Sequence, residues 1–416
     1  MSLNFRLHRL ISILALVGIL LSALAGCQQL LPMNEPVTIT FMYPDIDKGY
    51  YEGLLPKFKE LYPYITVQLK TYQWFRNRPD LDNVDVYVAS SWNNFGEGNL
   101  DFNQMLNLDS YISQESSFNP EEFYAGALDA FRKDGQLMAV PYGLDPYVMY
   151  YNRQVFKSYN IAAPQPDWTW NEFLQIAQKL TDPAVGTYGY VASEGYPDAF
   201  FFLFQHGGRL VDATGSPTLN DPANIAAMEW YSDLYHKYQV APTHEEAQKA
   251  FGYGRDPAVV GIVSGKAGMW AGSLTYRWAL QQYVQGAKFD WGMVPLPRDV
   301  VAFTGAFFEG YAINKESLYA DASWKWIFYL SQQIPERLMP ARRPLAESVA
   351  YEQRVGREIA NATRASMENA ILASPDMVDQ LGNSFTQFME AVQNMVDNGV
   401  PAREALETAQ QKALQP

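Results

Sequence analysis

Hydrophobic residues recur with two different periods along the chain, and this alternation predicts an α/β fold. Short stretches of alternating or continuously apolar residues, rich in β-branched side chains, are typical of strands. Such stretches lie at 37–41, 65–69 and 85–89. Residues 50–61 repeat apolar side chains every three or four positions and predict a helix, with Pro56 near its first turn. Strand, helix and strand in this order are typical of a parallel or mixed sheet covered by helices.

The middle of the chain predicts further helices through their start signals. Thr169-Trp-Asn-Glu172 is a capping box, and Asp221-Pro222 supplies an N-cap and a first-turn proline. Strands are expected again at 290–294 and 311–313, and beyond Asp321 the pattern is helical to the end. No stretch after the first 36 residues reaches the ~20 apolar residues of a membrane span.

Composition limits the class of protein and of partner. With 416 residues, of which 48% are hydrophobic and 18% charged, the chain can bury a large core. Its length predicts two or three domains. The 31 basic and 45 acidic side chains give a net charge of −14, which argues against nucleic acid as a partner. Aromatic residues make up 14% of the chain, enough for large cores and for stacking on a ligand.

The first 26 residues predict a signal peptide. Arg6 and Arg9 precede an apolar run from Leu10 to Leu21, which is too short for a membrane span. The leader ends in Leu24-Ala-Gly-Cys27, which resembles the bacterial lipobox, and Cys27 is the one cysteine of the chain. We therefore expect cleavage before Cys27, lipid attachment to its thiol, and a tether over residues 27–36 on the outer face of a membrane. The alternative is an ordinary signal peptide with an incidental cysteine.

Motifs of common enzymes are missing or incomplete. A single cysteine permits neither an intrachain disulfide nor a thiolate metal cluster, and the three histidines after the leader do not stand at metal-ligand spacing. There is no Gly-x-Ser-x-Gly sequence, and the glycine spacing of Gly261–Lys266 is one short of a phosphate-binding loop. We therefore expect no cofactor, no metal and no catalysis. The sequence leaves open a pair of carboxylates placed as in a glycosidase.

Several short sequences occur in an order that resembles a known family. The segment Val140–Asn152 carries a proline strand that runs to a Tyr-Asn pair, and Val155-Phe156 follows one turn later. The Thr169–Glu172 helix start comes next. The further matches are Phe204–Gly208, Leu219–Pro222, Gly265–Trp270, Asp290–Pro297 and Pro340–Arg343. Together they resemble the extracellular solute-binding proteins (family 1) of bacterial ABC importers, and within them the carbohydrate-binding branch that is similar to maltose-binding proteins.

The resemblance implies a two-lobe periplasmic-binding-protein fold (type II-like). Each lobe is then an α/β unit with a mixed sheet flanked by helices, and the ligand cleft lies between the lobes. Crossovers between the lobes are expected near residues 143–148, 308–312 and 345–360. On that basis lobe 1 combines residues 37–143 with 310–350, and lobe 2 combines residues 148–308 with 351–416.

Sugar recognition needs flat apolar rings and groups that hydrogen-bond to hydroxyls. By the resemblance, Asp145 lies at the first crossover, where similar sugar binders carry an acid, and Trp270 lies where the family often holds a stacking aromatic. The other candidate ligand residues are Asp47 and Lys48 after the first strand, Ser91, Trp92 and Asn94 after the third, Glu194 and Tyr196 in a loop, and Glu309 at the second crossover. For each of them the alternative is a structural role in a turn, a core or a solvated face.

One position departs from the maltose-binding pattern. That pattern has a stacking tryptophan near Phe385–Met389, and Met389 appears here instead, so specificity for long α-glucans is not expected.

The resemblance implies a non-catalytic receptor, lipid-anchored to the cell membrane and facing the extracellular or periplasmic side. It would deliver a sugar or oligosaccharide to the permease subunits of an ABC transporter, and we expect it to be a monomer. Two alternatives stay open, namely the same scaffold binding a polyamine, a polyol phosphate or a peptide, and a lipid-anchored glycosidase. Without the leader the net charge is 29 minus 45, or −16, which is compatible with a cationic ligand.

Overall fold

The computed structural model describes residues 35–73, 80–91, 100–252, 256–283, 290–372 and 375–415. Their main sheet has the strand order β2-β1-β3-β10-β6-β8-β7, with β9 and β11 also paired to β6 and β12 paired to β10. Its strands are β1 (Val37–Pro44), β2 (Ile65–Tyr72), β3 (Val86–Ser90), β6 (Ala139–Asn152), β7 (Tyr188–Tyr190), β8 (Ala267–Ser273), β9 (Trp291–Val294), β10 (Thr304–Ile313), β11 (Met339–Pro340) and β12 (Ala370–Leu372). A separate hairpin contains β4 (Arg132–Lys133) and β5 (Gln136–Leu137).

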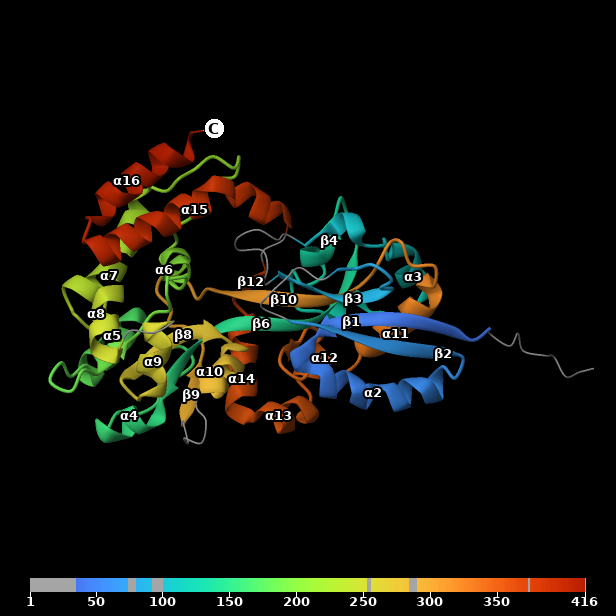
Figure 1. The fold of residues 1–416 in the computed structure, drawn as a ribbon. Helices are drawn as coiled ribbons and strands as arrows, with labels where there is room; N and C mark the ends of the chain where they lie inside the picture. The colour runs from blue at the N-terminus through green and yellow to red at the C-terminus, as the bar shows by residue number, and fades with distance from the viewer. Residues whose placement is uncertain are drawn as a thin grey trace, which may run out of the picture.

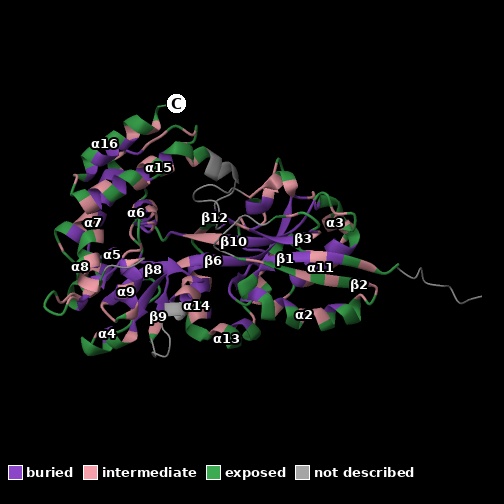
Figure 2. Ribbon diagram, viewed as in Figure 1, coloured by how far each residue is buried: buried purple, intermediate pink, exposed green. Residues whose placement is uncertain are grey.

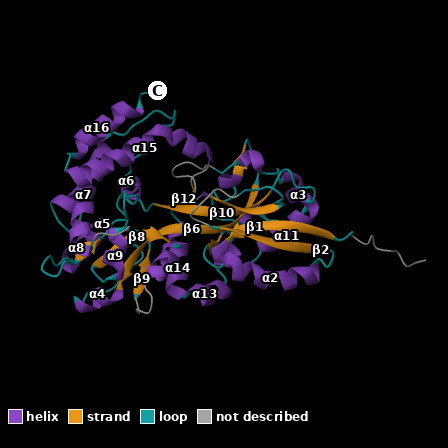
Figure 3. Ribbon diagram, viewed as in Figure 1, coloured by secondary structure: helices purple, strands orange, loops and turns teal. Residues whose placement is uncertain are grey.

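Helices lie on both sides of the strands (Figure 3). In chain order they are α2 (Lys48–Leu61), α3 (Asp109–Gln114), α4 (Arg153–Ser158), α5 (Trp170–Leu180), α6 (Ala199–Gln205), α7 (Pro222–His236), α8 (His244–Phe251), α9 (Pro257–Val263), α10 (Tyr276–Tyr283), α11 (Ala320–Leu330), α12 (Arg343–Ala346), α13 (Val349–Val355), α14 (Arg357–Met367), α15 (Pro375–Asn398) and α16 (Ala402–Ala413). The predicted α/β class with a mixed sheet flanked by helices is confirmed. Within the part of the chain described, no helix has the length and apolarity needed to cross a membrane.

The first unit of the chain folds largely as its pattern predicts. β1 and β2 pair in parallel along their full lengths, and α2 connects them. The helix begins at Lys48, however, so Pro56 lies in its interior and not in its first turn as predicted. The helix starts early because Tyr51 is buried together with Phe58 on its inner face. A proline inside a helix removes one backbone hydrogen bond, and burial of this face offsets that loss.

Two long strands run through both halves of the molecule (Figure 1). β6 pairs with β10 through residues 139–146 and with β8 and β9 through residues 147–152. This change of neighbours falls inside the crossover predicted near residues 143–148. β10 lies between β6 and β3, antiparallel to both. The lobe boundaries themselves stay a prediction.

A β-bulge interrupts the pairing of β6 with β10. Glu309 faces Gly143, but Gly310 faces Pro141, so the register passes over Tyr142. A bulge re-aims a side chain that regular alternation would send elsewhere. The Tyr142 hydroxyl reaches Glu309 from this position.

Buried residues are concentrated along the strands and the inner faces of the helices (Figure 2), and they form two hydrophobic cores. The first includes an edge-to-face group in which the Phe41 ring lies 4.8 Å from that of Tyr51 and 5.7 Å from that of Trp326. The second is built from α5, α6, α7, α15 and α16, where Phe173 and Tyr231 are fully buried. Each large apolar side chain buried in this way stabilises the fold by roughly 1.5–3 kcal/mol.

The C-terminal part is not helical throughout, which corrects the prediction made from its sequence. β11 and β12 are short strands inside it. They form because each adds to a strand already in place: β11 pairs antiparallel with β6, and β12 pairs in parallel with β10. Pairing with a distant strand leaves no trace in local periodicity.

Candidate functional site

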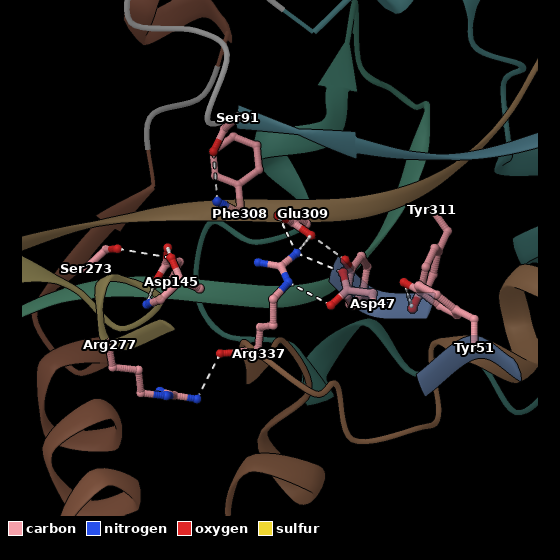
Figure 4. Close-up of polar contacts among 12 residues, drawn as sticks. Asp47, Tyr51, Ser91, Asp145, Ser273, Arg277, Phe308, Glu309, Tyr311 and Arg337 are labelled. Carbon is pink, nitrogen blue, oxygen red and sulfur yellow. Dashed lines mark hydrogen bonds and ion pairs between the residues drawn. The ribbon is translucent and has the colours of Figure 1, made fainter. Parts of the chain in front are cut away.

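A buried arginine joins two of the predicted acids (Figure 4). Arg337 donates to the Asp47 carboxylate from Nε at 2.7 Å and from Nη2 at 3.0 Å. The same Nη2 lies 3.2 and 3.1 Å from the two Glu309 oxygens. The side chains of Arg337, Asp47 and Glu309 are 2%, 5% and 1% exposed. We call these three residues the charge cluster; two of them were predicted as ligand residues, and the arginine between them was not.

Three separate segments place these side chains. Asp47 ends a short 3-10 turn directly after β1. Glu309 lies on β10, and Arg337 lies two residues before β11, which pairs with β6. Gly143 on β6 permits this approach, because a Cβ on it would stand 2.3 Å from Leu338 Cδ1. The charge cluster therefore depends on tertiary pairing between segments that are distant in sequence.

The charge cluster holds one positive and two negative groups away from water. Burial raises the pKa of Asp47, and Arg337 opposes that rise. Burial would lower the pKa of Arg337, but Glu309 and Asp47 raise it well above its usual value, so the guanidinium stays charged. The Tyr142 hydroxyl donates to Glu309, and burial raises the pKa of Tyr142, so this donor keeps its proton. Counted by formal charge, the cluster holds two carboxyl groups and one guanidinium, a net charge of −1.

Asp145 on β6 and Ser91, the residue after β3, are each held by protein groups (Figure 4). Asp145 is fully buried on β6, where Thr275 donates from its backbone N–H at 2.8 Å and from Oγ1 at 2.6 Å. Burial raises the pKa of Asp145, and the hydrogen bonds from Thr275 lower it. Ser91 Oγ accepts the Phe308 N–H at 2.8 Å. Both residues have a structural role, and their contact with a ligand stays a prediction.

The predicted residue Lys48 does not join the charge cluster. Lys48 is 64% exposed and lies 3.8 Å from Glu52, one helical turn away. It separates from its neighbour Asp47 because α2 begins between them and turns successive side chains in different directions. Trp92 and Asn94 lie outside the described residues.

Glu194 and Tyr196 line a pocket of about 290 Å³, counting the solvent at its mouth. Glu194 is exposed, whereas Tyr196 is buried with its hydroxyl on Asp397. His244 and Asp256 line the same pocket. Burial raises the pKa of Asp256, and Glu194 adds to that rise. The pocket shares no lining residue with the charge cluster.

Trp270 lies in the first core and is 1% exposed. On β8 it faces Tyr150 of β6, and the two rings stack with 5.5 Å between centroids and 2° between planes. These are the surroundings of a core residue. The prediction that Trp270 stacks on a ligand stays untested.

A row of aromatic rings, which the sequence reasoning missed, lies beside Asp145. It contains five rings, and the distances between the centroids of neighbouring rings, in the order given next, are 5.8, 4.6, 5.9 and 5.5 Å. In order, the rings are Phe307 on β10, Tyr147 on β6, Phe201 and Phe200 on α6, and Phe385 on α15. All but Phe201 are only half-buried, and Phe307 faces Asp145 across the strand pair. We call these five residues the aromatic row.

The aromatic row had a signal in the sequence. α6 carries the run Phe200-Phe-Phe-Leu-Phe204, which places large rings on more of the helix than one buried face needs. The segment Phe385–Met389, near which the maltose-binding pattern has a tryptophan, carries Met389 instead but supplies the Phe385 ring to the aromatic row. Half-buried rings of this kind present flat apolar faces to a ligand.

Residues 75–334 match the family model described as bacterial extracellular solute-binding protein, which is more than half of the chain. The chain belongs to this family. The resemblance predicted from short motifs is therefore confirmed. Members of the family are substrate-binding proteins that lie in the periplasm or outside the cell.

Two curated relatives have names that state a sugar. The arabinooligosaccharide-binding protein of Halalkalibacterium halodurans is 22% identical over 185 residues, which is 44% of this chain and 39% of the relative. The maltotriose-binding protein of Pyrococcus abyssi is 25% identical over 280 residues, which is 61% of this chain and 54% of the relative. The chain spans about half the length, or less, of these relatives.

Solved structures share the fold over nearly the whole chain. The sugar-binding protein MalE from Xanthomonas citri has a TM-score of 0.72 at 20% identity, covering 91% of this chain and 96% of that one. UgpB from Mycobacterium tuberculosis, in complex with glycerophosphocholine, has a TM-score of 0.70 at 16% identity, covering 91% and 97%. At these identities the likeness shows the fold, and it confirms the predicted two-lobe architecture.

Proposed function

We propose that the protein is the substrate-binding component of an ABC importer, capturing a sugar or oligosaccharide between its lobes and delivering it to the permease subunits. The observation that carries this proposal is the aromatic row beside buried acids. Phe307 faces Asp145 and lies two residues from Glu309, so strand alternation puts Phe307 and Glu309 on one face of β10. A sugar offers an apolar C–H face and many hydroxyl donors, which rings and carboxylates match respectively. The names of the two relatives support the same class of ligand.

The charge of the site favours a neutral ligand over a phosphate ester. Arg337 is shared between Asp47 and Glu309, which leaves one excess negative charge in the cluster. A phosphate would add to that charge and be repelled. Sugar hydroxyls donate to carboxylates without such repulsion, and hydrogen bonds to a charged acceptor are the stronger kind.

The proposal includes the anchoring and the motion expected from the sequence. Lipid on Cys27 and the tether of residues 27–36 would hold the protein to the outer surface of the membrane. The lobes would open to admit the ligand and close over it by hinge motion, as a monomer and without catalysis. We propose the lobes as residues 37–143 with 310–350, and 148–308 with 351–416.

Calorimetry on the detergent-solubilised full protein tests the ligand class. Maltotriose and an arabino-oligosaccharide are titrated beside glycerophosphocholine and spermidine. We expect a sugar to bind with a micromolar or lower Kd, to reduce the radius of gyration in small-angle scattering, and to be recovered unchanged. Binding of glycerophosphocholine or spermidine with no sugar bound would replace the sugar by a charged solute. Sugar recovered cleaved in proportion to protein would make the protein an enzyme.

A further inference from the structure

A second buried arginine lies beside the charge cluster. Arg277 on α10 is 6% exposed and donates to the carbonyl oxygens of Leu274 at 3.2 Å and of Arg337 at 3.1 Å (Figure 4). Across the described parts of the chain, no carboxylate forms an ion pair with Arg277. Burying a guanidinium without a carboxylate partner is costly, so its two carbonyl contacts need a reason.

The contact with the Arg337 carbonyl closes a circuit of side-chain and main-chain contacts. Thr275, two residues before Arg277, donates twice to Asp145 on β6. The residue before Asp145 is Leu144, which pairs with Met339 of β11. Met339 follows Arg337 by two residues, and the Arg337 carbonyl returns to Arg277. The turn after β8 and the strand β6 thus hold the main chain of residue 337 from two sides.

We propose that Arg277 is a positioning residue that fixes the main chain of residue 337, so that the Arg337 guanidinium spans Asp47 and Glu309. A long arginine side chain has several rotamers, and it makes hydrogen bonds to two acids at once only when its backbone is held. The circuit supplies that restraint from the half of the molecule that contains α10. Only the expected effect on ligand affinity rests on the proposed function.

Displacing the Arg337 guanidinium should change how the stability of the protein depends on pH, even without ligand. The charged groups that act on Asp47 are Arg337, Glu309 and Glu336. The hydroxyl groups around them keep their protons because burial raises the pKa of each: Tyr43, Tyr50, Tyr51, Tyr72, Tyr142 and Tyr311. Since burial raises the pKa of Asp47, the stability linked to its protonated form is present at low pH and lost as pH rises through the folded pKa. Arg337 lowers the pKa of Asp47, so moving its guanidinium away should raise that pKa further. The pH at which this stability is lost then rises as well.

Urea unfolding of the full protein from about pH 4 to pH 8 tests the inference without ligand. The variants are Arg277→Met, which lacks the donors, and Arg277→Lys, which keeps a cation and one donor. The free energy of unfolding falls as pH rises, and we expect the midpoint of that fall to lie about one pH unit higher in Arg277→Met than in the wild-type protein. Arg277→Lys should rise less, and it keeps the test available if Arg277→Met does not fold. In an Asp47→Asn background the shift should vanish.

A loss of stability that does not depend on pH would contradict the positioning role of Arg277. If both variants are destabilised by the same amount at every pH, Arg277 only packs, and the inference is overturned. A second measurement titrates maltotriose, for which we expect affinity to fall about tenfold in Arg277→Met, at a pH where the variant is folded. If the wild-type protein binds no sugar, the proposed function fails, and the role of Arg277 is judged by the unfolding data alone.

Discussion

Replacing Trp270 by alanine separates a packing role from a ligand-binding role. The side chain is 1% exposed, and its ring stacks on Tyr150 with 5.5 Å between centroids. Truncating a buried tryptophan to alanine costs about 3–5 kcal/mol, because apolar contacts are lost and a cavity remains. An aromatic pair accounts for about 0.5–1.5 kcal/mol of interaction beyond its buried area. We therefore expect Trp270→Ala to lower the free energy of unfolding by several kcal/mol and to leave the affinity for sugar nearly unchanged.

The matched control is Phe200→Ala in the aromatic row. Phe200 is only half-buried, so its truncation should cost about 1 kcal/mol of stability. If the aromatic row stacks on a sugar, loss of one ring should weaken binding by about 0.5–1.5 kcal/mol, which is roughly two- to tenfold in Kd. Trp270→Ala should therefore lose mainly stability, whereas Phe200→Ala should lose mainly affinity for sugar.

Urea unfolding followed by far-UV circular dichroism measures stability without relying on the fluorescence of the residue removed. Calorimetry at a temperature where both variants are folded measures affinity. A Trp270→Ala protein with an unchanged urea midpoint and a lost affinity would refute this reasoning. It would establish that Trp270 reaches the ligand, as its sequence setting suggested.

Three further predictions follow from other buried or anchored groups. Asp198 is 2% exposed and burial raises its pKa, so the stability linked to its protonated form is lost as pH rises through that pKa. Asp198→Asn should therefore make the free energy of unfolding in urea depend less on pH between about pH 4 and pH 7. The same pH dependence in the variant and the wild-type protein would contradict this. Gly143→Ala should cost about 1–3 kcal/mol in urea unfolding because its Cβ would meet Leu338 Cδ1 at 2.3 Å and Leu338 Cβ at 2.8 Å; an unchanged urea midpoint would argue against this clash. Cys27→Ser should leave the protein soluble or unprocessed in a membrane fractionation, and unchanged mass and partition would rule out lipid attachment.

Elements with a local signal could be predicted from the sequence. The capping box at Thr169 opens α5 as expected, because both of its hydrogen bonds join residues three positions apart. Asp47 and Glu309 could be proposed one at a time, Asp47 because it follows the first predicted strand and Glu309 because it lies at the second predicted crossover, and their contact with a ligand stays a prediction. Their connection through Arg337 could not be found, because that ion pair joins residues 290 positions apart and has no pattern in the chain.

The prediction for Trp270 illustrates a signal with a second explanation. Glycines on both sides of Trp270, at positions 268 and 272, are compatible with a backbone that lies close to a ligand. In the structure they make room for neighbouring side chains: a Cβ on Gly268 would stand 2.9 Å from Leu180 Cδ1, and one on Gly272 would stand 3.0 Å from Tyr276 Cδ1. Small residues indicate close approach, and the sequence does not say whether a ligand or the protein itself approaches.

The shared strand β6 also determines how the molecule can be divided. Residues 139–146 complete one half of the sheet and residues 147–152 complete the other. A fragment that ends at either side of this strand exposes an unpaired edge where an interior strand belongs, which is a template for aggregation. Neither half is therefore an independent folding unit, and the first hydrophobic core, which contains Trp270 of β8, extends into both halves. Unfolding of one half removes half of a strand from the other, so heat or denaturant should melt both in one cooperative transition.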